Sequence, residues 1–172
     1  MREQLWQDCI KFHGHQCPGL AIGFRAAELA SELMSLTYSK DEEVICISEN
    51  DACGVDAIQY ITGCTVGKGN LIFKNVGKMA FTFLNRETNE GYRFLLNPLP
   101  KDIEDKIDYI LNEDSEKVFK ISKSNIEFPK KAERMATIIC DKCSEGAAES
   151  KIRLQKGLKL CLDCYSEDNR GW

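Results

Sequence analysis

The sequence has little of what marks a membrane, secreted or nucleic-acid-binding protein. No apolar run approaches the roughly 18 residues that a membrane span needs, and the charged N-terminal stretch contains no apolar signal region. Basic residues are in the minority, with 23 Lys and Arg against 27 Asp and Glu, so the net charge is −4. This charge argues against a general nucleic-acid or anionic-membrane binder. We therefore expect a cytoplasmic protein without membrane contacts.

Histidine is scarce, with two residues among 172, whereas cysteine is frequent and odd in number, with nine. In a reducing cytoplasm thiols stay free, so metal binding or thiol chemistry is favoured over a disulfide framework. A chain of this length accommodates one ordinary domain and a small appendage. An appendage of about 40 residues is too small to bury a core and needs a metal ion or disulfides to fold.

Hydrophobic spacing and turn residues predict an α+β fold. Helices are expected over residues 2–12, 18–36, 54–62, 102–111 and 116–121. Strands are expected over residues 44–48, 70–74, 78–84 and 92–96. Short turns separate the last three strands, which predicts an antiparallel meander. The expected core is an antiparallel sheet packed with helices.

Composition and motif positions divide the chain into three parts. We expect an α+β core domain over residues 1–122, a basic linker or arm over residues 123–136, and a small treble-clef zinc-finger domain over residues 137–172. The linker surrounds Pro129 and carries several basic side chains, which is typical of a segment exposed to solvent.

Four cysteines in the last part predict a structural zinc site. Cys140 and Cys143 form one Cys-x2-Cys pair, and Cys161 and Cys164 form another after seventeen intervening residues. Two such pairs supply four thiolates for a closed tetrahedral zinc site with no open ligand position. The sequence between them suits a hairpin, and residues 162–168 suit a short helix, which together resemble a treble clef. Metal binding should supply most of the folding free energy of this segment.

The charge of the finger bears on its partner. From Ile138 to Trp172 there are six basic and six acidic side chains, and four zinc-bound thiolates add further negative charge. No basic stripe for phosphate binding is present. We therefore favour a protein partner, or stabilisation of a dimer, over nucleic acid.

Both histidines of the chain lie close to one cysteine. His13 and His15 precede Cys17, and Pro18 is suited to the first position of a helix. Cys17 is then the N-cap residue, where free N–H groups and the helix dipole stabilise a thiolate. A thiolate beside imidazoles serves either as a metal ligand or as an activated nucleophile. His13 has a simpler alternative role, as a cap of the preceding helix.

A second cluster begins where a strand runs into a helix. Cys53 lies at the predicted N-terminus of the helix over 54–62, and Asp51 and Asp56 flank it. Spacing alone permits a site formed by His15, Cys17 and Cys53. The alternative is that each cysteine is a small buried hydrophobic residue, the role that we assign to Cys9 and Cys46.

The segment from Gly63 to Gly69 resembles a phosphate-binding loop but departs from the motif. It is one residue short between glycines, and Gly69 stands where Ser or Thr should bind magnesium. The glycines are better explained by tight backbone turns. Lys68 remains a candidate anion contact.

Several motifs together resemble the FmdE family, which is named for a component of formylmethanofuran dehydrogenase. The motifs are residues 12–25, 51–59, 62–71 and 77–81. The resemblance implies an α+β core, an intertwined homodimer, a C-terminal treble clef, and a metal-binding cleft around the His-x-Cys-Pro motif. Transferred to this chain, the cleft ligands are His15, Cys17 and Cys53, with His13 and Cys64 as second choices.

Three functions follow as alternatives. The first is a metal-binding accessory or regulatory protein of formylmethanofuran dehydrogenase or molybdoenzyme one-carbon metabolism, because the chain has no pterin-binding region of a catalytic component. Its core ion would be zinc, nickel, copper or iron, with Asp51 and Asp56 orienting the ligands. The second is a metal-dependent or thiol-based enzyme in which Cys17 and Cys53 are catalytic. The third is a metal or redox sensor whose finger binds protein or nucleic acid.

Overall fold

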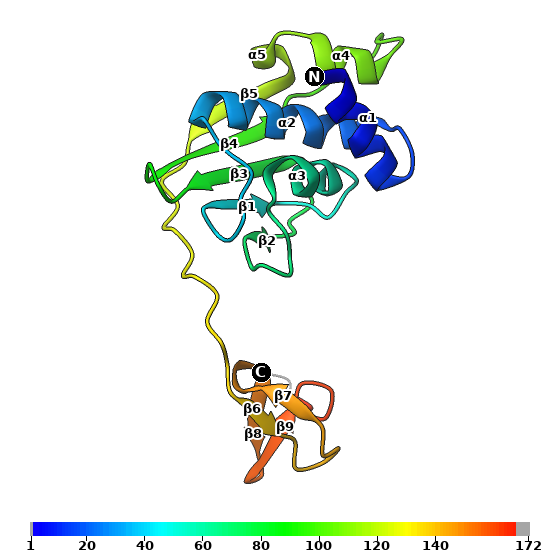
Figure 1. Cartoon of the computed structure of the whole chain (residues 1–172). Helices are drawn as coiled ribbons and strands as arrows, with labels where there is room; N and C mark the ends of the chain where they lie inside the picture. The colour runs from blue at the N-terminus through cyan, green and yellow to red at the C-terminus, as the bar shows by residue number, and fades with distance from the viewer. Residues whose placement is uncertain (1, 168–172) are drawn as a thin grey trace. The chain divides into compact units, whose positions relative to one another are not determined.

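The chain divides between Lys131 and Ala132 into two structural units (Figure 1). The computed structural model describes residues 2–167. Within that range no helix combines the length and the apolar character that crossing a bilayer requires. The first unit ends at Lys131, and Phe128 near this end packs against its core.

Five α-helices lie in the first unit between residues 2 and 131. They are α1 (Arg2–His13), α2 (Pro18–Met34), α3 (Gly54–Thr62), α4 (Lys106–Asn112) and α5 (Ser115–Val118). The first three agree with the sequence prediction. α4 begins four residues later than expected, because Asp105 is its N-cap and its side chain accepts hydrogen bonds from the N–H groups of Ile107 and Asp108.

A five-stranded sheet in the order β2-β1-β3-β4-β5 supports these helices. The strands are β1 (Val44–Ser48), β2 (Leu71–Phe73), β3 (Ala80–Asn85), β4 (Glu90–Leu96) and β5 (Phe119–Lys123). β1 and β2 are parallel, and the other pairs are antiparallel. The α+β prediction with a mainly antiparallel sheet is therefore confirmed.

Two details of the predicted sheet are wrong. β2 does not join a meander: the N–H groups of Lys74 and Lys78 donate to the carbonyls of Ser48 and Glu49, so the chain crosses the end of β1 before β3 begins. β1 therefore lies between β2 and β3, and α3 is the crossover helix of a parallel pair. The predicted helix over 116–121 ends at Val118, because from Phe119 onward the chain pairs with β4.

The main core lies between the sheet and the helices that cover one of its faces (Figure 1). Large aromatic side chains fill it, and successive rings meet edge to face: Trp6 with Phe24, and Phe94 with both Phe83 and Phe119. Edge-to-face pairs add stability beyond the burial of their area.

The other face of the sheet has a small apolar cluster. Ile45, Ile47 and Leu84 are buried there, and Phe128 packs against them. Arg86 also donates a hydrogen bond to the carbonyl oxygen of Pro129 at 2.6 Å. The first half of the segment predicted as a linker is thus attached to the core.

Between residues 132 and 167, the second unit is built from two hairpins. β6 (Thr137–Ile139) pairs with β7 (Gly146–Ala148), a 3-10 turn covers Glu149–Lys151, and β8 (Ile152–Gln155) pairs with β9 (Leu158–Cys161). The β8–β9 hairpin agrees with the prediction. The predicted helix over 162–168 is not formed as far as residue 167, because a single turn closes on the carbonyl of Cys161 and the chain then leaves it. The last residue of that prediction, 168, lies outside the described residues.

Candidate metal centre

Four thiols meet in the second unit. The Sγ atoms of Cys140, Cys143, Cys161 and Cys164 all lie within 4.8 Å of one another. Cys143 and Cys161 are 3.9 Å apart, and tetrahedral zinc with Zn–S bonds of about 2.3 Å requires sulfur separations of about 3.8 Å. The four-cysteine cluster can therefore hold a metal ion such as zinc.

Backbone hydrogen bonds shape the turns that carry these thiols and lower the pKa of one of them. Each cysteine pair lies in a tight turn, one after β6 and one at the end of β9. Asp141 links the first turn to β9 through two hydrogen bonds with Lys159. Backbone N–H groups of Cys143, Cys161 and Lys142 lower the pKa of Cys140 to about 6. Burial, followed by the neighbouring thiols, raises the pKa of Cys164 to about 12. A bound cation would offset this crowding of negative charge.

A second set of ligand atoms converges at the junction of α1 and α2. The side chains of His13, His15 and Cys17 each offer one ligand atom within 4.8 Å of the others. His13 ends α1, and Gly14, with a φ of 97°, turns the chain so that the two imidazoles lie 4.5 Å apart between ring centroids. Cys17 is the N-cap of α2, as predicted, and accepts a hydrogen bond from the N–H of Leu20 at 3.3 Å.

Asp56 of α3 orients His13. Its Oδ2 atom lies 2.7 Å from Nδ1 of His13, and Nε2 of the same ring lies 3.9 Å from Sγ of Cys17. A carboxylate at Nδ1 favours the tautomer that carries its proton there, which leaves the Nε2 lone pair facing the thiol. This arrangement fits the donor set of a transition-metal ion.

The structure brings Cys53 beside Cys17. A Cβ atom built on Gly19 would lie 3.7 Å from Sγ of Cys53 and 3.8 Å from Sγ of Cys17. Burial raises the pKa of Cys53, and its contact with Cys17 raises it further. A second sulfur therefore adjoins the three converging ligands.

Close packing of two helices causes this proximity. Gly23 of α2 and Gly54 of α3 touch through their backbones, and a Cβ atom on Gly54 would lie 2.9 Å from the carbonyl oxygen of Gly19. The N-termini of both helices, each with a cysteine, are thereby held together.

Two other candidate residues lie elsewhere. Cys64 follows the C-terminal end of α3, about 15 Å along the helix from Cys53. It is buried, its thiol lies 3.5 Å from the carbonyl of Val44, and burial raises its pKa to about 11. Lys68 donates to the carbonyl of Ser39 at 2.6 Å, so its ammonium group ties the glycine-rich loop to the core.

Sequence reasoning named Asp51 and Asp56 together, and only the fold distinguishes them. Asp56 contacts His13, whereas Asp51 is exposed. Gln59 was not predicted from the sequence as a site residue. Its Nε2 atom lies 3.4 Å from Oδ1 of Asp56. The spacing of three residues on one helix was the available signal.

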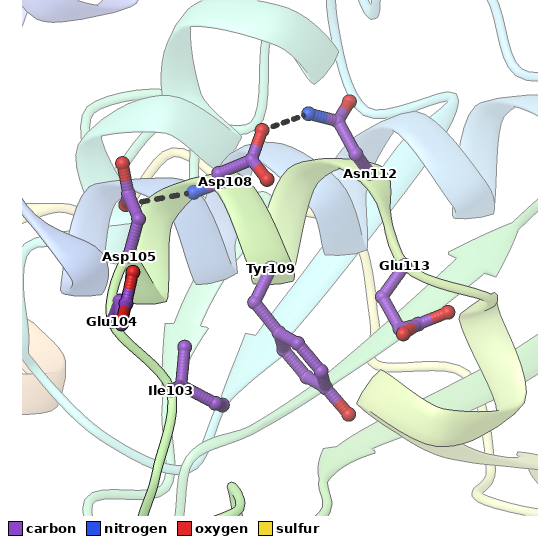
Figure 2. A pocket seen from close by; sticks show the side chains of 7 residues that line it. All are labelled: Ile103, Glu104, Asp105, Asp108, Tyr109, Asn112 and Glu113. Carbon is purple, nitrogen blue, oxygen red and sulfur yellow. Dashed lines mark hydrogen bonds between the residues drawn. The ribbon is translucent and has the colours of Figure 1, made fainter.

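A separate acidic cavity of about 490 Å³ lies along α4 (Figure 2). Its carboxylates are engaged locally: Asp105 caps the helix, and Asp108 accepts a hydrogen bond from Asn112. Asn112 also contacts Arg2, at the start of α1. His13 lies at the other end of α1, about 16 Å away along the helix axis. This cavity is therefore separate from the cluster of His13, His15 and Cys17.

His13, His15 and Cys17 of the second cluster lie within a match to a known family, as do Cys53 and Asp56. The family model described as FmdE, Molybdenum formylmethanofuran dehydrogenase operon, matches residues 12–148. The chain belongs to the FmdE family. The resemblance inferred from the motifs is thereby confirmed, and the FmdE match extends into the second unit as far as β7.

Two further proteins are similar to this chain. A crystal structure of a tungsten formylmethanofuran dehydrogenase FmdE-like protein from Syntrophus aciditrophicus aligns with a TM-score of 0.71, covers 95% of this chain and 91% of its own, and is 22% identical. It shows a shared fold. A "Probable S-adenosyl-L-methionine-binding protein" from Archaeoglobus fulgidus is 36% identical over 91 residues, which are 51% of this chain. The match spans 25% of the length of that relative.

Proposed function

We propose that this FmdE-family chain is a metal-binding homodimer that acts as an accessory or regulatory protein of formylmethanofuran dehydrogenase or a related molybdoenzyme of one-carbon metabolism. The observation that carries the metal site is the convergence of His13, His15 and Cys17 within 4.8 Å. Imidazole and thiolate donors together suit zinc, nickel, copper or iron rather than magnesium.

Each residue of the core site has a distinct role in this proposal. His13, through Nε2, and His15 and Cys17 hold the ion, and Asp56 fixes the ring of His13. Cys53 completes the ligand set or remains a free thiol beside it. A transition ion held by these residues would supply Lewis acidity.

The homodimer and the finger belong to the same proposal. The family resemblance implies an intertwined dimer, and exposed apolar side chains of the first unit, among them Leu33 and Val76, offer surface for it. On the second unit Leu154, Leu158 and Leu162 are likewise exposed. Apolar surface with balanced charge favours a protein partner over nucleic acid.

A thiol-based or metal-dependent enzyme is the second candidate. Asp56, His13 and Cys17 form a carboxylate–imidazole–thiol series with separations of 2.7 Å and 3.9 Å. Such a series activates a nucleophile when the imidazole takes the thiol proton. Cys17 would attack, and Cys53 is close enough to act as a second reacting thiol.

Metal analysis of the purified full chain tests the leading proposal. We expect about two ions per chain, one in each cluster, and about one after Cys17→Ser. Cys64→Ala, which removes a buried thiol outside both clusters, should retain both ions. One ion per chain that survives Cys17→Ser would eliminate the core metal site. Iodoacetamide reactivity of Cys17 well above that of a free cysteine, in metal-free protein at about pH 6, would favour the enzyme instead.

A further inference from the structure

An aromatic cavity lies next to the candidate metal centre. Its volume is about 480 Å³, and its lining residues are Phe12, Tyr38, Gln59, Tyr60 and Thr65. They come from the end of α1, the loop after α2, the second half of α3 and the loop that follows α3. Small-molecule sites typically have volumes of a few hundred Å³, with apolar walls and a few polar groups.

Three aromatic rings form the walls, and each leaves much of its surface open. Phe12, Tyr38 and Tyr60 are 56%, 59% and 37% exposed. The rings of Phe12 and Tyr60 are 5.8 Å apart and tilted by 46°, so they do not cover each other face to face. Open ring faces are suited to stacking on a planar ligand.

Contacts outside the cavity hold the ring of Tyr38 in place. The ring of Tyr38 packs on the backbone of Gly63, where an added Cβ atom would lie 3.0 Å from it. The ammonium group of Lys68 lies 5.6 Å from the centroid of the same ring and also donates to the carbonyl of Ser39. A ring fixed in this way loses little side-chain entropy when a ligand stacks on it.

Polar atoms of the cavity remain available. Nε2 of Gln59 is directed at Asp56, but its Oε1 atom accepts no hydrogen bond from any residue between 2 and 167. The same holds, over that range, for the hydroxyl groups of Thr65, Tyr38 and Tyr60. An amide oxygen and several hydroxyls can pair with ring nitrogens and exocyclic groups of a heterocycle.

Hydrogen bonds connect this cavity to the metal centre. Gln59 contacts Asp56 at 3.4 Å, and Asp56 contacts His13 at 2.7 Å. Phe12 and His13 are consecutive residues at the end of α1. A ligand that binds Gln59 would therefore lie one side chain away from the carboxylate that orients a metal ligand.

We propose that this cavity binds a planar heteroaromatic ring of bicyclic size. The ring stacks on Tyr60 and Phe12 and forms hydrogen bonds with Gln59 and Thr65. The proposal that a ring binds here depends only on the residues that line the cavity. The further idea, that the part of the ligand outside the ring contacts the metal ion, rests on the proposed function.

Binding of defined probes to the full, metal-replete chain tests this proposal. We would titrate adenosine and pterin, both neutral bicyclic heterocycles, with ribose as the non-aromatic control, and follow saturation-transfer NMR and calorimetry. At least one heterocycle should bind saturably and ribose should not. Tyr60→Ala should weaken binding about tenfold or more, the usual effect of removing a stacking platform. Phe73→Ala, which removes an aromatic of similar exposure from β2, should leave the affinity unchanged.

Two results would overturn the proposal: no saturable binding of either heterocycle, or equal affinity in Tyr60→Ala and wild type. If sedimentation changes in Tyr60→Ala while the probe affinity does not, this face is assigned to a contact between copies of the chain. Metal content measured in the same samples separates the two proposals. Probe binding without a core ion would refute only the metal function, and a core ion without probe binding would refute only the ring site.

Discussion

A Cβ atom on Gly23 would lie 1.9 Å from the carbonyl oxygen of Gly54, so the backbones of α2 and α3 are in direct contact at these two residues. Cys17 precedes one helix and Cys53 precedes the other. The distance between the two cysteines therefore depends on the absence of side chains at the crossing of the helices.

Gly23→Ala should destabilise the first unit. Replacing glycine with alanine inside a helix usually adds about 1 kcal/mol of stability, but here the methyl group would overlap the backbone of α3. We expect the free energy of unfolding to fall by about 2 kcal/mol or more, as for other overpacked cores, measured by urea titration. Gly67→Ala is the control, since a Cβ atom there meets open space. A stabilised Gly23→Ala variant would contradict the close contact of the two helices.

Asp56→Asn should weaken metal binding at the proposed core site without removing a ligand. Loss of the carboxylate at Nδ1 frees the ring of His13 to rotate or change tautomer, and losses of this kind typically cost about 10- to 100-fold in metal affinity. Competition with a chromophoric chelator would measure it. Asp51→Asn removes an exposed carboxylate of the same segment and should leave the affinity unchanged. Equal affinities for the two variants would argue against a role of Asp56 in orienting His13.

Removal of the metal should unfold the second unit alone. In the described part of this unit, the apolar cluster contains four side chains besides the cysteines: Leu160, Ala147, Ile152 and Tyr165. This apolar contact is too small to fold about 40 residues. Hydrogen exchange read by mass spectrometry should show loss of protection over residues 137–164 after chelation or Cys161→Ser, with β1 and β3 unaffected. Lys142→Gln is the matched control within the turn. Retained protection in Cys161→Ser would show that the unit folds without its metal.

Glu49 should make stability depend on pH. Arg93 binds both of its carboxylate oxygens, at 2.5 Å and 2.8 Å, and this pairing lowers the pKa of Glu49 below 4.5. Because the folded pKa is the lower one, the stabilisation is complete above about pH 4.5 and disappears as the pH falls through the folded value. Glu49→Gln should cost about 1–2 kcal/mol at pH 7, and the difference from wild type should shrink in urea titrations as the pH falls below 4.5, the ordinary pKa of a glutamate. A difference that is independent of pH would exclude this ionic contribution.

The sequence by itself determined the local features of this protein. Pro18 after Cys17 placed the thiol at a helix N-cap, and the helix over 54–62 and the strand over 44–48 have the predicted bounds. The four-cysteine cluster and the hairpin between its two Cys-x2-Cys pairs could also be predicted from the sequence. These features depend on capping, periodicity and turn residues within a few positions of each other, so they need no knowledge of the rest of the chain.

Only the tertiary structure decided which distant residues meet. β2 pairs with β1 rather than β3, residues 119–121 join the sheet instead of a helix, and Asp56 rather than Asp51 reaches His13. Cys53 adjoins Cys17 while Cys64 does not, because one precedes and the other follows α3. Such outcomes depend on how closely whole helices and strands pack, and here that packing is set by backbone contact at two glycines, to which no local pattern assigns a partner.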